Sequence, residues 1–141
     1  MATRGEVTEA VVLSEFVRLG VDVFVPWAHH LPFDLVVSAD GDTFLRVQCK
    51  SGRERGGCVI FNSASTDHGR GPQHYRDRAD LFAVWCPTVD QVYIVPVEEA
   101  GNRDTSLRLR PTRNNQVRRI RLAEEYTLER WAAGMLTRAV A

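Results

Sequence analysis

Two periodicities of apolar residues run along the chain, and together they predict a domain built from helices and strands. Residues 6–19 place their large apolar side chains on or beside one face, which predicts an amphipathic helix that Gly20 ends. Residues 128–140 are amphipathic in the same way and are predicted to form a second helix. Between these two segments the apolar residues fall in short runs, which are typical of strands.

The short apolar runs predict six strands and the class of the fold. They cover residues 21–25, 33–39, 43–50, 58–62, 81–86 and 91–97. The last two are almost continuously apolar, as in strands that are buried on both faces of a mixed sheet. Residues 63–74 are polar, rich in glycine and without periodicity, which predicts a loop. The order of elements indicates an α/β or α+β domain with a central mixed sheet flanked by helices.

The turn Asp40-Gly41-Asp42 predicts a β-hairpin whose register can be derived. A two-residue loop would mix polar side chains into both faces of the hairpin, whereas a three-residue loop separates them cleanly. The apolar face then contains the pairs Phe33 with Cys49, Leu35 with Val47, and Val37 with Leu45. On the opposite face Asp34 lies across from Gln48, and Lys50 follows two residues along the same strand.

A fourth polar group, Glu9, is expected beside Asp34, Gln48 and Lys50. Glu9 lies one turn before Leu13, on the apolar side of the first predicted helix, where a carboxylate needs a cation. An ordinary buried Glu–Lys or Asp–Lys ion pair is the alternative interpretation. Carboxylate and carbonyl oxygens suit Mg²⁺ or Mn²⁺ better than Zn²⁺. A divalent ion beside a lysine matches the hydrolysis of phosphodiesters.

Size and composition narrow the class of protein. The chain has 141 residues and 15.9 kDa, with 44% hydrophobic and 26% charged residues, so we expect one folded domain over residues 1–141. No apolar run approaches the ~18 residues of a membrane span, so no membrane partner is expected. The three cysteines lack the spacing of zinc ligands, and we expect free thiols in a reducing cytoplasm. Of the eighteen basic residues seventeen are arginine, and the only lysine is Lys50.

Arginines are concentrated near the end of the chain and predict contacts with nucleic acid. Residues 103–121 contain seven arginines and one acid, an excess of +6 in a chain of zero net charge. The alternation of residues 107–110 (LRLR) places Arg108 and Arg110 on one face of a predicted strand. Solvated surface arginines, or ion pairs with Glu98, Glu99, Glu124 and Glu125, are the alternative.

Residues 63–75 are a second candidate, since their polar side chains could reach bases in a groove; an ordinary surface loop without a function is the alternative. The residues expected to contact DNA are Arg46, Arg53, Arg55, Arg70, Tyr75, Arg108, Arg110, Arg113, Arg118 and Arg119.

Aromatic residues and histidines outside these motifs have simpler expected roles. Trp27, Trp85 and Trp131 are expected in the core or at an interface. His29 and His30 are expected in an exposed loop.

The motifs that surround the four polar groups resemble the PD-(D/E)xK nuclease superfamily. They are residues 5–10 (GEVTEA), 31–35 (LPFDL) and 47–50 (VQCK), with further similarity at residues 83–87, 92–97, 113–116 and 120–126. The chain most resembles the group I intron-associated homing endonucleases, in which glutamine replaces the second acidic residue.

This resemblance implies a restriction-endonuclease-like core over about residues 5–97, followed by an arginine-rich DNA-contacting and helical part over about residues 103–141. It implies that Asp34 is the principal metal ligand, with the backbone carbonyl of Cys49 and with Glu9. Gln48 then stands in place of the usual acid, and Lys50 is the catalytic lysine. The chain departs from the family pattern at Phe33, which separates Pro32 from Asp34, and at Gln48, which removes one negative charge.

The function that the resemblance implies is Mg²⁺- or Mn²⁺-dependent endonucleolytic cleavage of double-stranded DNA by a dimer or tetramer. Two alternatives stay open. The first is a Holliday-junction resolvase, and the second is a catalytically inactive DNA-binding module.

Overall fold

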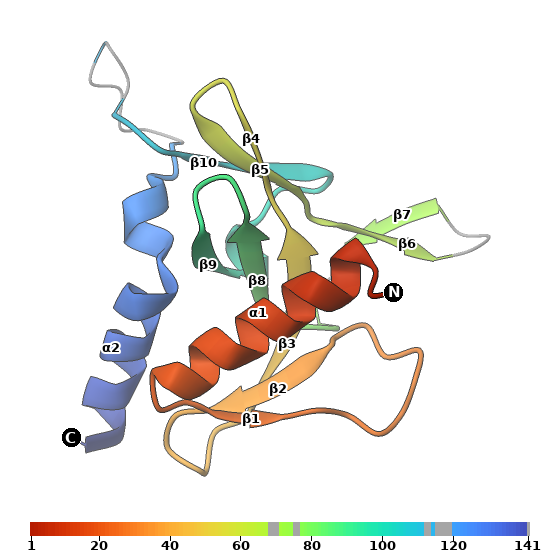
Figure 1. Ribbon diagram of the computed structural model, residues 1–141, viewed down its shortest axis with the longest axis vertical. Helices are drawn as coiled ribbons and strands as arrows, with labels where there is room; N and C mark the ends of the chain where they lie inside the picture. The colour runs from red at the N-terminus through yellow and green to blue at the C-terminus, as the bar shows by residue number, and fades with distance from the viewer. Residues whose placement is uncertain (68–70, 75–76, 112–113, 115–119, 141) are drawn as a thin grey trace.

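A five-stranded mixed sheet lies at the centre of the molecule (Figure 1). The structure is a computed structural model that describes residues 1–67, 71–74, 77–111, 114 and 120–140. The strand order of the sheet is β1-β2-β3-β8-β9, in which only β3 and β8 run parallel. Its strands are β1 (Asp22–Phe24), β2 (Leu35–Ser38), β3 (Leu45–Ser51), β8 (Leu81–Cys86) and β9 (Gln91–Pro96).

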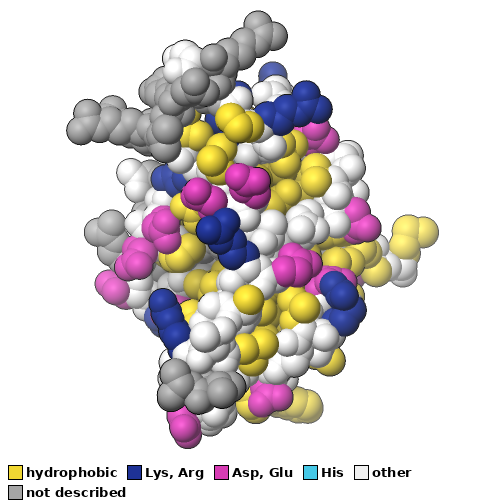
Figure 2. Space-filling view, turned by 90° about the vertical axis from the view of Figure 1, so that its left-hand side faces the viewer, with side chains coloured by type: hydrophobic (Ala, Val, Ile, Leu, Met, Phe, Trp, Pro, Cys, Tyr) yellow, Lys and Arg dark blue, Asp and Glu magenta, His cyan; other side chains and the backbone are white. Residues whose placement is uncertain are grey.

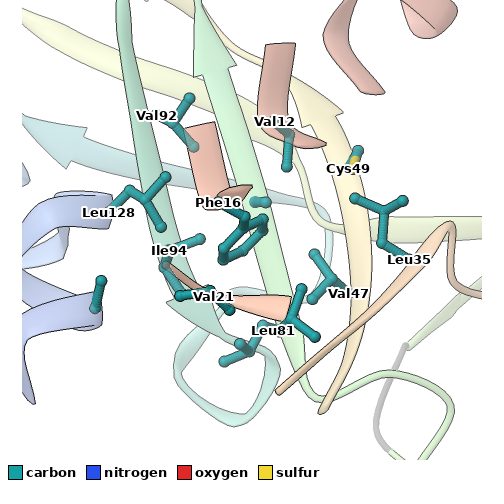
Figure 3. Close-up of a cluster of buried hydrophobic side chains, with 13 residues drawn as sticks. Val12, Phe16, Val21, Leu35, Val47, Cys49, Leu81, Val92, Ile94 and Leu128 are labelled. Atoms are coloured by element: carbon teal, nitrogen blue, oxygen red, sulfur yellow. The ribbon is translucent and has the colours of Figure 1, made fainter. Parts of the chain in front are cut away.

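Helix α1 (Arg4–Arg18) covers one face of this sheet. It begins at a capping box, in which Thr3 Oγ1 accepts from the Glu6 amide and Glu6 Oε2 accepts from the Thr3 amide. Its apolar face buries Val12 and Phe16 against β2, β3, β8 and β9 (Figure 3). Helix α2 (Leu128–Val140) stands beside β9 and adds Leu128 to the same cluster. The two predicted helices are therefore confirmed.

A second, three-stranded sheet covers the other face of the central sheet. Its order is β10-β5-β4, formed by β10 (Asp104–Arg108), β5 (Cys58–Asn62) and β4 (Arg53–Arg55). Phe61 of this sheet packs edge-on against Phe82 of β8, with ring centroids 5.4 Å apart. Two short 3₁₀ helices, η1 (Val97–Glu99) and η2 (Ala123–Tyr126), complete this side of the molecule.

The β2–β3 hairpin has the predicted register, with Leu35 opposite Val47, Val36 opposite Arg46 and Val37 opposite Leu45. Asp40 holds the turn, because its Oδ1 accepts from the amides of Asp42 and Thr43 at 2.8 and 2.7 Å. These amides hold the pKa of Asp40 down, at about 2.

The start of the hairpin differs from the prediction at Phe33. Strand β2 begins only at Leu35, and Phe33 packs against the apolar cluster under the second sheet instead of facing α1. The physical reason lies at Asp34, whose carboxylate accepts the Cys49 amide in place of a backbone carbonyl, so the ladder ends there.

The prediction of a loop over residues 63–74 is wrong. Within this segment β6 (Ala64–Asp67) and β7 (Gly71–His74) form an antiparallel hairpin. The pair is too polar to show the usual alternation of apolar and polar residues, so its sequence carries no strand signal.

The tryptophans divide between surface and core. Trp27 is 97% exposed and is not a core residue, whereas Trp85 and Trp131 pack partly buried against the cluster under α1. His29 and His30 are exposed, as predicted. No helix in the described part of the chain is long and apolar enough to cross a membrane.

Candidate active site

Two carboxylates from different elements meet at one end of the hairpin. Glu9 comes from the second turn of α1, and Asp34 immediately precedes β2. Partial burial, the negative charge of Asp34 and a side-chain hydrogen bond with Asp34 together raise the pKa of Glu9 to about 7. The two carboxyl groups are thus in direct contact, and their role as metal ligands stays a prediction.

Asp34 is held against β3 by two hydrogen bonds. Its Oδ2 accepts from the Cys49 amide at 2.9 Å, and its own amide donates to the Val47 carbonyl at 2.8 Å. The Cys49 thiol is buried beside it, and burial together with the negative charges of Asp34 and Glu9 raises the pKa of that thiol. Asp34, Glu9 and Cys49 therefore form one electrostatic unit.

Gln48 and Lys50 lie on the other side of β3 from Val47 and Cys49, as strand alternation requires. Gln48 Nε2 lies 3.5 Å from the Cys49 carbonyl oxygen, at the limit of a hydrogen bond. Lys50 Nζ lies 6.0 Å from the centroid of the Phe82 ring on β8. The convergence of the Lys50 ammonium with the two carboxylates stays a prediction.

The donor atoms at this site are oxygens. No group of three or more His, Cys, Asp or Glu side chains in the described residues could hold a metal ion. The structure brings together two carboxylates, from Glu9 and Asp34, while the Cys49 carbonyl as a further ligand and Gln48 in the place of a further acid stay predictions. Such a set is suited to a hard divalent cation.

One supporting contact is absent from the sequence predictions. The side chain of Thr8, which is buried, lies 2.6 Å from Ser51 Oγ at the end of β3. This hydrogen bond joins the helix turn that carries Glu9 to the strand that carries Cys49 and Lys50. A polar residue on the inward face of the first helix is the only signal for it, and the pattern does not identify its partner.

Three of the predicted DNA-contacting arginines share one face of the second sheet. The register pairs Arg108 with Cys58 and Cys58 with Arg55, while Arg53 lies two residues from Arg55. Leu107 and Val59 alternate with them and are buried, so Arg53, Arg55 and Arg108 lie on the outer face. We call these three residues the outer arginine row. Arg53 is 3.8 Å from Asp104 of the same sheet.

The other predicted arginines are placed differently. Arg46 binds Asp80 through its backbone amide, Nε and Nη2, and it donates through Nη1 to the Asp77 carbonyl. Strand β10 ends at Arg108, so the prediction that Arg110 shares its strand face is wrong; Arg108 Nε donates back to the Arg110 carbonyl. The remaining predicted contacts lie outside the described residues: Arg70, Tyr75, Arg113, Arg118 and Arg119.

Intramolecular pairing accounts for one more arginine of the charged segment. Arg121 donates to the backbone carbonyl of Glu99, at 3.0 and 2.6 Å. The alternative to DNA contact is pairing of these arginines with glutamates. Arg121 does pair with Glu99, but through the backbone carbonyl of Glu99 and not through its carboxylate.

The solved structures similar to this chain include two nucleases. One is the bacterial homing endonuclease I-Ssp6803I, with a TM-score of 0.67, 20% sequence identity and coverage of 99% of this chain and 96% of that one. The other is Hjc, a Holliday junction resolvase of Archaeoglobus fulgidus, with a TM-score of 0.47, 18% identity and coverage of 75% and 84%. No curated protein matches the sequence.

The similarity to the homing endonuclease confirms the predicted restriction-endonuclease-like fold. The sequence itself matches the family model described as PD-(D/E)XK endonuclease over residues 1–129, most of the chain. The chain therefore belongs to the PD-(D/E)XK endonuclease family.

Proposed function

We propose that this protein is a divalent-metal-dependent endonuclease that hydrolyses double-stranded DNA. The observation that carries the proposal is the contact between the Glu9 and Asp34 carboxyl groups beside the Cys49 backbone, on the strand that holds the only lysine of the sequence. Membership of a nuclease family supports the same chemistry.

Glu9, Asp34 and the Cys49 carbonyl would hold Mg²⁺ or Mn²⁺. Their fit is electrostatic: two carboxylates in contact repel each other when both are ionised, and a divalent cation relieves this repulsion. A bound ion of this kind polarises a phosphate and lowers the pKa of a water molecule.

The chain's own groups prepare the site for phosphate. The Cys49 amide holds Asp34 in place, and the Thr8–Ser51 hydrogen bond holds the turn that carries Glu9. In this proposal the Lys50 ammonium, two residues beyond Gln48 on β3, binds the phosphate and stabilises the charge that develops on it. Gln48 contributes a neutral amide where an acid would add a charge, so the site relies on two carboxylates.

The outer arginine row is the proposed contact for the DNA backbone. Two of its members, Arg53 and Arg55, follow Lys50 closely in the chain, because β3 leads through Gly52 into β4. Three arginines on one exposed sheet face would each neutralise a phosphate. Because each subunit is small, we keep the predicted dimer or tetramer as part of the proposal.

The decisive experiment is a cleavage selection on randomised duplex DNA with Mg²⁺ and with Mn²⁺. Asp34→Asn and Lys50→Ala should reduce the rate by about a hundredfold or more, because the first removes a charge that would hold the metal ion and the second removes the charge that would act on the phosphate. Arg18→Ala is the matched control, since Arg18 pairs with Glu15 on the solvent side of α1. A folded Asp34→Asn or Lys50→Ala protein that cuts at the wild-type rate would contradict the proposal.

A catalytically inactive DNA-binding module is the second candidate, and Gln48 favours it because the site then has only two acids among the described residues. Salt-sensitive DNA binding without cleavage in either metal would support this candidate. Four-way junctions belong in the same experiment, since a preference for them over linear duplex would identify a resolvase.

A further inference from the structure

The connection between β1 and β2, residues 25–34, exposes an unusual amount of apolar surface. Trp27 is 97% exposed, Val25 is 66% exposed and Leu31 is 41% exposed. Single exposed apolar residues are common, but several on one short loop, including a tryptophan, indicate an interaction site.

This loop is continuous with the candidate active site, because its last residue is Asp34. Asp34 follows Trp27 by seven positions, so the two Cα atoms lie at most about 25 Å apart. Figure 1 shows that the loop and the β6–β7 hairpin project to the side of the molecule on which α1 begins. Glu9 lies in the second turn of that helix. A duplex that reaches the carboxylates therefore lies on the side of the molecule to which the loop projects.

The loop carries no negative charge that would repel a polyanionic partner. Residues 25–33 contain no acidic side chain, and they contain His29 and His30, whose rings are 6.4 Å apart. At the base of the loop, Phe24 of β1 packs edge-on against Phe44, with ring centroids 5.7 Å apart. This aromatic pair anchors the end of the strand from which the loop departs.

We propose that Trp27 contacts DNA by stacking its indole on a nucleobase near the cleaved bond, so that the loop positions the duplex over Asp34. The inference rests on the proposed function and extends it to a residue outside the family motifs. An indole offers a flat apolar surface that any base can stack on, and apolar side chains can insert between base steps. The alternative partner for the exposed loop is a second copy of this chain. Continuity with Asp34 and the absence of acids from residues 25–33 favour DNA.

Two measurements on the full chain in EDTA test this role. The first is the anisotropy of a fluorescein-labelled, mixed-sequence duplex, titrated with the wild type and with Trp27→Leu and Trp27→Phe. The second is the tryptophan emission of the wild type when unlabelled duplex is added, since stacking quenches an indole. Val17→Ala is the matched control, because Val17 is an exposed apolar residue near the C-terminal end of α1.

If Trp27 stacks on a base, duplex quenches the emission of the wild type, and the quenching is lost in Trp27→Phe. Trp27→Leu then binds about tenfold to a hundredfold more weakly, while Trp27→Phe retains most of the affinity because its ring still stacks. The sedimentation of every free variant stays that of the wild type. Val17→Ala binds like the wild type.

Unchanged affinity of Trp27→Leu, or sedimentation of the free Trp27→Leu protein as a smaller species, would overturn the inference. The second result would assign the loop to contacts between copies. In both cases metal-dependent cleavage by the wild type leaves the proposed nuclease intact. If the wild type neither binds duplex nor cuts it, the proposed function fails and the inference fails with it.

Discussion

The Glu9–Asp34 pair shows how two residues far apart in sequence change each other's chemistry. A solvated glutamate is ionised at neutral pH, but burial and the neighbouring Asp34 raise the pKa of Glu9 to about 7. Folding without a cation therefore brings together two groups that repel each other. In the proposed function, a divalent ion held by both carboxylates would relieve this repulsion.

This pair predicts how the stability of the metal-free protein depends on pH. The pKa of Glu9 is about 7 in the folded state and 4.5 in its ordinary state, so between these values the folded protein binds more protons than the unfolded chain. The free energy of unfolding should fall as the pH rises from 4.5 to 7, by on the order of 1 kcal/mol because the pair is still partly solvated.

Urea unfolding in EDTA at pH 5 and pH 8 measures this dependence. Glu9→Gln keeps the shape of the side chain and should flatten the profile. Glu15→Gln is the control, since Glu15 lies on the same helix and pairs with the exposed Arg18. Equal pH profiles of stability for the wild type and Glu9→Gln would show that the contact with Asp34 does not raise the pKa of Glu9.

At the scale of elements, the passage of β3 into β4 depends on Gly52. A Cβ atom at this position would lie 2.9 Å from Cγ1 of Val59 and 2.9 Å from Cγ1 of Val84. The Gly52 amide also donates to the Trp85 carbonyl at 2.8 Å, which keeps β3 and β8 in close contact. Only a residue without a side chain lets the chain cross between the two sheets here.

We therefore expect Gly52→Ala to destabilise the protein by about 1–3 kcal/mol, because the added methyl group overpacks the core. Gly134→Ala is the matched control. Gly134 lies within α2, and a methyl group added there would meet no atom within 4 Å, so alanine should stabilise that helix by about 0.5–1 kcal/mol. Thermal unfolding of the two variants measures the loss of stability expected for Gly52→Ala and the gain expected for Gly134→Ala. Unchanged stability of Gly52→Ala would show that Val59 and Val84 move aside.

At the scale of the whole molecule, DNA binding depends on where the charges lie and not on the net charge. The net charge is zero, yet the second sheet gathers Arg53, Arg55 and Arg108 on its outer face. Figure 2 shows the side of the molecule that lies at the left of Figure 1, on which acidic and basic side chains are mixed with hydrophobic ones. A duplex is therefore expected on the surface that carries the outer arginine row.

The salt dependence of duplex binding tests whether the outer arginine row is the DNA-binding surface. Arg55→Ala should lower the slope of log K against log salt by about one, because one phosphate contact is lost. Arg18→Ala should leave the slope unchanged, since Arg18 is on α1 and bonds Glu15 at 2.6 Å. Anisotropy titrations at several salt concentrations measure both slopes. An unchanged slope for Arg55→Ala would move the DNA-binding surface elsewhere.

Local patterns are sufficient for the helices, for most strands and for the register of the β2–β3 hairpin. Alternation defines which residues share a face, and it gives the pairs Leu35 with Val47 and Val37 with Leu45 correctly. The predicted pairing of Asp34 with Gln48 lies beyond the end of the observed ladder and stays a prediction. The inward face of the first helix likewise indicates Glu9. These features depend on neighbours within a few residues or on one hairpin.

Contacts between distant segments decided the rest. The carboxylate of Asp34 ends the strand ladder and sends Phe33 to the opposite core, and Asp80 occupies the guanidinium of Arg46. The exposure of Trp27 depends on how the β1–β2 loop leaves the sheet. By itself the sequence determined the chemistry that is available and the period of each element. Only the tertiary structure decided which groups meet, because burial and pairing across the chain depend on packing that no local pattern encodes.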